Sequence, residues 1–117
     1  MSHDYRGAFK ESVAEYKTLR ETAPGPMDAF AQLHKAAVQE GALGTKTKEL
    51  MALAIGVAMR CKGCVVSHAR AAVKAGATMQ EIGEAVGVAV LMGGGPATVY
   101  GGKAVEAARQ FSEPAAG

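Results

Sequence analysis

The sequence has no tryptophan, and only 5% of its 117 residues are aromatic. A chain with so few large rings has little bulky apolar material from which to build a core of its own. It contains four prolines, and its 15 glycines follow no three-residue period, which excludes a collagen-like chain. Hydrophobic residues still make up 49% of the chain and charged residues 21%, which argues against disorder. The length fits one domain.

An excess of one charge is also missing, since the formal net charge is only +2. Lysine and arginine are scattered rather than clustered, which argues against a nucleic-acid partner. The longest apolar run, Leu50–Met59, is too short to cross a bilayer, and the polar segment Met1–Lys10 does not resemble a signal peptide. We therefore expect a soluble, cytoplasmic protein without a membrane or nucleic-acid partner.

Small residues, in contrast, are abundant: alanine and glycine together account for one third of the chain. Three glycines, Gly56, Gly83 and Gly87, fall inside segments with a helical pattern, where each costs about 1 kcal/mol relative to alanine. Close approach of neighbouring helices is one explanation, and tolerated drift is the other. We expect helices packed closely through small side chains, with a core completed by a second copy of the chain.

Apolar residues recur at helical spacing in six segments, and glycine or proline separates most of them. No segment has a convincing strand pattern, so the expected fold is all-α, a compact bundle of about six helices. We expect an N-terminal helix within residues 1–24, a helical domain over 25–111 and a loose tail at 112–117. The expected helices cover residues 4–21, 28–40, 45–60, 61–75, 78–92 and 96–111.

Helix ends are marked by residues with known capping preferences. Gly41 and Gly76 suit the ends of the second and fourth segments, and Thr45 or Thr47 suits the start of the third. Thr78-Met79-Gln80-Glu81 is a capping-box sequence that opens the fifth segment. The third segment is apolar nearly all round after Glu49, which predicts that it is buried.

The chain has only two cysteines, too few for a disulfide scaffold. Cys61 and Cys64 are three residues apart and His68 follows four residues later, so a helix places all three on one face. An imidazole can accept a thiol proton and then stabilise the thiolate, and a helix N-terminus favours a thiolate at Cys61. Such a pair can close a disulfide after one thiol has attacked a substrate.

Other interpretations of these residues remain open. Cys64 could be an inert buried residue, or Cys61, Cys64 and His68 could bind zinc with a fourth ligand from Glu49 or another chain. Haem attachment requires histidine directly after the second cysteine, so it is excluded. Glu49 could favour the helix dipole or act as a partly buried proton acceptor near the thiols. We expect His34 to be structural or exposed, His3 to lie in a frayed terminus, and Tyr100 to lie in the core rather than to line the pocket.

Three stretches of the sequence resemble the carboxymuconolactone decarboxylase superfamily, and its alkylhydroperoxidase D-like branch in particular. They are Lys48-Glu49-Leu50-Met51-Ala52-Leu53-Ala54-Ile55, the Cys61-x-x-Cys64-x-x-x-His68 motif, and Met92-Gly93-Gly94-Gly95-Pro96. The resemblance covers roughly residues 25–110. It implies an all-helical fold whose motif helices form a core shared between subunits, in trimers or in hexamers built from dimers.

The resemblance also implies roles for single residues. Cys64 would be the attacking thiol, Cys61 the resolving thiol, and His68 with Glu49 the proton relay. Gly63 stands where alkylhydroperoxidase D has a second histidine, so a simpler relay is expected. The decarboxylases themselves lack the cysteine pair, which argues against lactone decarboxylation.

We therefore expect a thiol-dependent hydroperoxidase with an antioxidant role, which needs no metal or organic cofactor. Its implied partners are a hydroperoxide substrate, a dithiol reductant such as a lipoyl group or a small thiol protein, and further copies of the chain. One alternative is a disulfide reductase or thiol-exchange protein without peroxidase activity. Another is a non-enzymatic zinc-binding oligomer.

Overall fold

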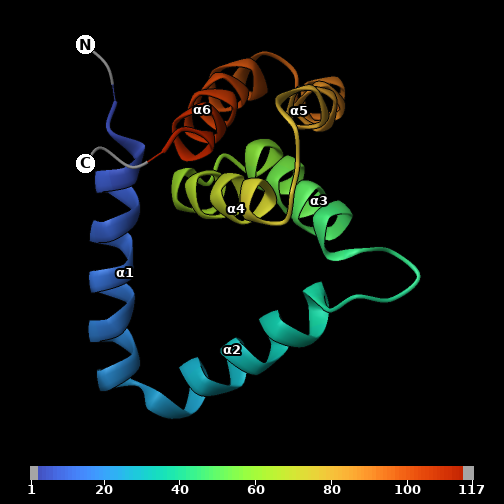
Figure 1. Ribbon diagram of the computed structural model, residues 1–117. Helices are drawn as coiled ribbons and strands as arrows, with labels where there is room; N and C mark the ends of the chain where they lie inside the picture. Colours follow the sequence, from blue (N-terminus) through green and yellow to red (C-terminus); the bar gives the residue numbers. More distant parts are fainter. Residues whose placement is uncertain (1–2, 115–117) are drawn as a thin grey trace.

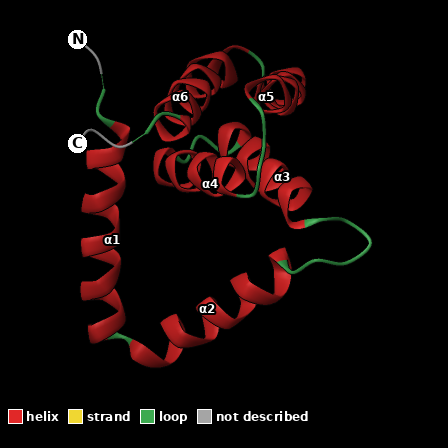
Figure 2. Ribbon diagram, in the orientation of Figure 1, coloured by secondary structure: helices red, strands yellow, loops and turns green. Residues whose placement is uncertain are grey.

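The computed structural model describes residues 3–114, which form six α-helices and no strand (Figure 2). This confirms the all-α fold. None of the helices in the described part is long and apolar enough to span a membrane. The helices are α1 (Tyr5–Thr22), α2 (Pro24–Val38), α3 (Thr45–Ala58), α4 (Lys62–Lys74), α5 (Met79–Gly93) and α6 (Gly95–Ser112).

Helices α3 to α6 pack on one another, whereas α1 and α2 extend away from them as an arm (Figure 1). The bundle core contains a few branched aliphatic side chains, among them Leu53, Val57, Val65 and Ile82. Most of its other buried members are alanines, as the composition predicts, and small side chains let helix axes approach closely. The buried alanines are Ala69, Ala72, Ala89, Ala97, Ala104, Ala107 and Ala108.

The arm is attached to the bundle mainly through the first turns of α1. The Tyr5 side chain is buried, and its backbone N–H donates a hydrogen bond of 2.9 Å to Gln110 Oε1 on α6. The Arg70 guanidinium on α4 lies 4.4 Å from the centroid of the Phe9 ring. Helix α2, by contrast, contains no buried residue. The arm therefore leaves most of its apolar side chains uncovered within one chain.

The expected ends of α2 and α3 are partly wrong. Pro24 opens α2, four residues before the expected start, because proline fits the first helical turn. Gly41 is not the C-cap, which is Gln39. Neither Thr45 nor Thr47 caps α3; Gly44 holds that position. Instead, the Glu40 side chain accepts a hydrogen bond of 3.0 Å from the Thr45 N–H. An upstream carboxylate therefore satisfies a free N–H of the first turn of α3, which the sequence assigned to a threonine.

The later boundaries agree better with the sequence. Thr78 and Glu81 form the expected capping box of α5. Gly76 has a φ of +99° and ends α4 as expected. Helix α6 continues to Ser112, one residue beyond its expected end, and residues 115–117 of the expected loose tail lie outside the described part.

Of the three helix glycines, only Gly56 is explained by a close approach within the chain. A Cβ atom at Gly56 would lie 3.1 Å from the Cβ of Cys64, so this glycine lets α3 approach α4 at the cysteine motif. No atom lies within 4 Å of a Cβ built at Gly83 or Gly87. The close-packing explanation is therefore wrong for those two positions within a single chain.

Helix α3 is buried on one face only, which corrects the expectation of burial nearly all round. Leu53 and Val57 point into the core, whereas Met51, Ile55 and Met59 are exposed on the other side of the helix. The apolar character of α3 therefore exceeds what one copy of the chain buries.

Candidate functional site

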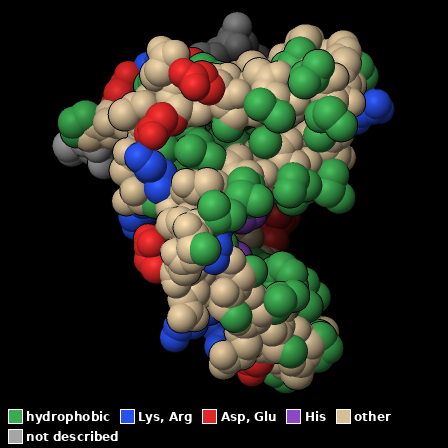
Figure 3. All heavy atoms as spheres, turned by 90° about the vertical axis from the view of Figure 1, so that its right-hand side faces the viewer, with side chains coloured by type: hydrophobic (Ala, Val, Ile, Leu, Met, Phe, Trp, Pro, Cys, Tyr) green, Lys and Arg blue, Asp and Glu red, His purple; other side chains and the backbone are tan. Residues whose placement is uncertain are grey.

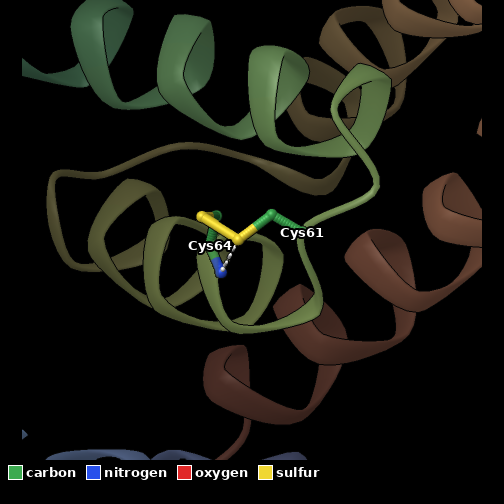
Figure 4. The surroundings of a disulfide bond; sticks show 2 residues. All are labelled: Cys61 and Cys64. Atoms are coloured by element: carbon green, nitrogen blue, oxygen red, sulfur yellow. Dashed lines mark hydrogen bonds between the residues drawn. A yellow bond between two sulfur atoms is a disulfide. The ribbon is translucent and has the colours of Figure 1, made fainter.

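The two cysteines form a disulfide at the N-terminus of α4, with their Cα atoms 5.2 Å apart (Figure 4). Cys61 is the N-cap residue, and its Sγ accepts a hydrogen bond of 3.2 Å from the Cys64 N–H. The sequence prediction that this pair can close a disulfide is confirmed. Because Cys61 Sγ receives a backbone N–H at a helix N-terminus, a thiolate formed there would be stabilised.

The turn before Cys61 positions it through two backbone hydrogen bonds at the end of α3. The Cys61 N–H donates to Gly56 O at 3.0 Å, and the Arg60 N–H donates to Val57 O at 3.1 Å. This is the Schellman pattern, and its left-handed residue is Arg60, with a φ of 59°. The chain thus reverses within three residues and brings α4 back against α3 at Gly56.

Glu49 on α3 and His68 on α4 form the polar centre of the site. Glu49 is the only buried charged residue of the described part, with 4% of its surface exposed. Its Oε1 lies 2.7 Å from His68 Nδ1, a short hydrogen bond or ion pair. His68 follows Cys64 by one helical turn, so α4 presents the imidazole on the same face as this thiol.

His34 on α2 is half-exposed, which fits the expectation of a structural or exposed residue, but it also joins this pair. Its Nε2 lies 4.0 Å from Glu49 Oε2, and its ring centroid lies 6.0 Å from that of His68. No local pattern indicates this, because His34 reaches Glu49 only through the packing of α2 beside α3. His34, Glu49 and His68 each offer one donor atom, and these atoms lie within 4.8 Å of one another. They are also residue types that bind metals.

A cavity of about 330 Å³ opens beside the two imidazoles, between the arm and α4. Tyr16 and Phe30 contribute aromatic walls, and His34 and His68 contribute polar ones. The space-filling view shows histidine and acidic side chains within the hollow between the bundle and the arm (Figure 3). The site therefore combines an apolar surface with imidazole groups that solvent can reach.

The remaining residues of interest lie elsewhere. Tyr100 packs against the hydrophobic core, as expected. His3 is exposed, and its ring lies 5.6 Å from that of Tyr5. His3 also contacts α6, because its carbonyl accepts a hydrogen bond from Gln110 Nε2. It takes no part in the cluster around Glu49.

Two uncharacterised bacterial proteins are similar in sequence to the chain. One, from Cupriavidus necator, is 34% identical over 105 residues, which cover 90% of this chain and 93% of that protein. The other, from Paracoccus denitrificans and named uncharacterised protein 4 in cox locus, is 38% identical over 78 residues. These residues cover 67% of this chain and 70% of that protein.

Solved structures of two carboxymuconolactone decarboxylase family proteins share the fold. The Legionella pneumophila protein superposes with a TM-score of 0.91 at 40% identity, covering 96% of this chain and all of that one. The Thermotoga maritima protein gives a TM-score of 0.79 at 30% identity, covering 89% of each chain. The sequence model of the family matches residues 24–110. This match and the shared fold show that the chain belongs to the carboxymuconolactone decarboxylase family.

Proposed function

We propose that the chain is a thiol-dependent hydroperoxidase in which Cys61 and Cys64 are the redox pair and His68 with Glu49 is the proton relay. One observation carries the proposal: the disulfide-forming pair lies at the N-terminus of the helix that also bears His68, and the buried Glu49 carboxylate is hydrogen-bonded to the His68 imidazole. The Thermotoga maritima relative is described as a possible participant in the antioxidative response, which agrees with this function.

The reaction would begin with His68 accepting the Cys64 proton while Glu49 stabilises the imidazolium. The Cys64 thiolate attacks a peroxide oxygen, the O–O bond breaks, and the leaving alkoxide takes the proton from His68. Cys64 is now a sulfenic acid. The Cys61 thiolate attacks its sulfur, an S–S bond forms, and hydroxide leaves as water after protonation. An external dithiol then reduces the disulfide and is itself oxidised to a disulfide.

The surroundings of the pair suit this sequence of steps. The hydrogen bond that Cys61 Sγ accepts from Cys64 N–H favours a thiolate at Cys61, which is what a resolving thiol and a leaving group require. The aromatic walls of Tyr16 and Phe30 suit an organic hydroperoxide. The cycle itself uses no metal or organic cofactor. In a reducing compartment such as the cytoplasm, a lipoyl group or a small thiol protein would reduce the Cys61–Cys64 disulfide after each turnover.

The test is hydroperoxide turnover with a dithiol such as dihydrolipoamide. Cys64→Ser and Cys61→Ser are each expected to abolish catalytic turnover. Glu49→Gln and His68→Asn are expected to lower it roughly 100-fold or more, the usual contribution of a general acid–base group. His3→Gln changes a histidine outside the site and should leave the rate unchanged. Full activity in both cysteine variants would overturn the proposal.

A disulfide reductase is the second candidate, because the same Cys61–Cys64 bond would serve thiol exchange. The two functions differ in substrate. The wild-type protein is therefore offered a hydroperoxide and a small disulfide at equal dithiol concentration. Turnover of the disulfide alone would replace the peroxidase proposal by thiol exchange.

A further inference from the structure

We propose that His34, Glu49 and His68 form a binding site for a divalent transition metal ion, with zinc as the best fit. The site uses neither cysteine, and it therefore differs from the Cys61, Cys64 and His68 site considered from the sequence. It goes beyond the proposed peroxidase chemistry, because it assigns His34 a function and gives Glu49 and His68 a second one.

Three helices bring the donor atoms of the site together. The three side chains come from α2, α3 and α4, and one donor atom from each lies within 4.8 Å of the others. Two ligand atoms in a tetrahedral zinc site are about 3.3 Å apart, given zinc bond lengths of roughly 2.0–2.2 Å. His68 Nδ1 lies 2.7 Å from Glu49 Oε1, which is shorter than this value, and His34 Nε2 lies 4.0 Å from Glu49 Oε2, which is longer. Because the three donor atoms lie within 4.8 Å of one another, changes of at most about 1.5 Å in their separations would bring them to this spacing.

The Glu49 carboxylate is buried and lies beside both histidines. Its side chain is 5% exposed, and its Oε2 lies too far from His34 Nε2 for a direct hydrogen bond. A buried anion is costly unless a cation or several hydrogen bonds compensate it. His68 supplies part of that compensation at Oε1, and an ion between Oε2 and the two imidazoles would add to it at the oxygen that lies 4.0 Å from His34 Nε2.

The three side chains are also suitable zinc ligands, and the two histidines are accessible from solvent. Two histidines and one glutamate are a known zinc-ligand set, which leaves a fourth position open to water or substrate. The His34 side chain is 51% exposed and that of His68 23% exposed. Both line the cavity of about 330 Å³, so an ion can enter and a fourth ligand has room there.

The disulfide separates this site from a cysteine site. Both cysteines are paired in the structure, and a disulfide offers no thiolate to a metal. An ion on His34, Glu49 and His68 would instead occupy the nitrogen and oxygen that the proposed relay needs. Zinc should therefore inhibit peroxide turnover reversibly, a consequence that rests on the proposed function.

The experiment titrates the metal-free, untagged chain in its disulfide form with Zn²⁺ in a calorimeter, and with Co²⁺ followed by visible absorption. We expect one ion per chain, with the cobalt bands of a site that contains nitrogen ligands. His34→Ala and Glu49→Gln should each weaken binding about 100-fold or more, since even outer-shell substitutions cost 10- to 100-fold. His3→Ala removes a histidine outside the cluster and should leave binding unchanged.

The outcomes distinguish the two proposals. Binding by the disulfide form needs no free thiol, so it would stand even if the protein reduced no peroxide. The metal proposal fails if the disulfide form binds neither ion at millimolar concentration, or if His34→Ala binds as tightly as the wild type. It also fails if binding appears only after reduction and is lost in Cys61→Ser, which would assign the metal to the cysteines.

Discussion

At the scale of single residues, the two cysteines occupy different surroundings. Cys61 caps α4 and its sulfur accepts the Cys64 N–H, whereas Cys64 lies inside the helix one turn before His68. The helix N-terminus therefore stabilises negative charge at Cys61, and the imidazole is placed to take a proton from Cys64. This difference supports unequal roles in the proposed reaction, with Cys64 attacking and Cys61 resolving.

This assignment predicts where a sulfenic acid accumulates. In Cys61→Ser the resolving thiol is missing, so one equivalent of hydroperoxide should leave Cys64 as a sulfenic acid that a 1,3-dione reagent traps. Cys64→Ser should be labelled at least about tenfold more slowly, because Cys61 lacks a partner one helical turn away. Mass spectrometry of the labelled peptides measures both. If Cys61 in Cys64→Ser is labelled faster than Cys64 in Cys61→Ser, then Cys61 is the attacking thiol and Cys64 the resolving one.

The residues of the site differ in how far the sequence revealed them. Cys61, Cys64 and His68 follow one another in steps of one helical turn, so spacing alone grouped them on one face. Glu49 and His68 are 19 residues apart, so the sequence offered Glu49 only as one possible proton acceptor or zinc ligand, and the family resemblance gave it a role beside His68. His34 has no local signal, because it meets Glu49 through the packing of a different helix. Local periodicity predicts shared faces within a helix, but not which helices meet.

At the scale of helices, α3 and α4 end in the same Schellman pattern with different left-handed residues. Gly76 closes α4 with a φ of +99°, and Arg60 closes α3 with a φ of 59°. The matching hydrogen bonds run from Ala77 N–H to Ala72 O and from Gly76 N–H to Val73 O. Glycine adopts this conformation freely, whereas arginine is strained in it.

Arg60→Gly should therefore stabilise the protein. Removing the left-handed strain gains roughly 1–2 kcal/mol, and the extra freedom of glycine in the unfolded chain costs roughly 0.5–1 kcal/mol. We expect a net gain of about 0.5–1 kcal/mol in the free energy of unfolding, measured by urea denaturation of the disulfide form. Gly76→Ala is the matched change at α4 and should destabilise by about 1 kcal/mol. A loss of stability in Arg60→Gly would contradict this account of the turn.

Helix boundaries were predictable where the signal is local. The capping box of α5 and the glycine after α4 act on neighbouring residues, and both were correct. The expected C-cap of α2 and N-cap of α3 are wrong because contacts between the two helix ends, on either side of the loop, set these boundaries. The Thr45 hydroxyl donates to Val38 O at 2.7 Å, and Lys48 Nζ donates to Gln39 O at 2.6 Å. These contacts, rather than residue preference, fix where α2 ends and α3 begins.

At the scale of the whole molecule, the chain leaves many large apolar side chains exposed, and adjoining ones mark a surface for a partner. A groove between α3 and α5 has only apolar lining, including Ile55, Met59 and Met92. Leu91 beside it is 79% exposed, and Leu33 on the arm is 62% exposed. Seven alanines supply much of the buried core of one copy. The larger apolar residues remain on its faces, which supports the proposed homo-oligomer.

The oligomer proposal can be tested at Leu91, which lies on the exposed face of α5. We expect the wild type to elute as a trimer or hexamer in size-exclusion chromatography with light scattering. Leu91→Glu should shift it to smaller species, because an unpaired carboxylate buried between subunits weakens association roughly 100-fold or more. Leu91→Met keeps an apolar side chain and should leave the assembly intact. If the wild type is a monomer at micromolar concentration, the proposal is contradicted, because the exposed face of α5 would then be in contact with solvent and not with another subunit.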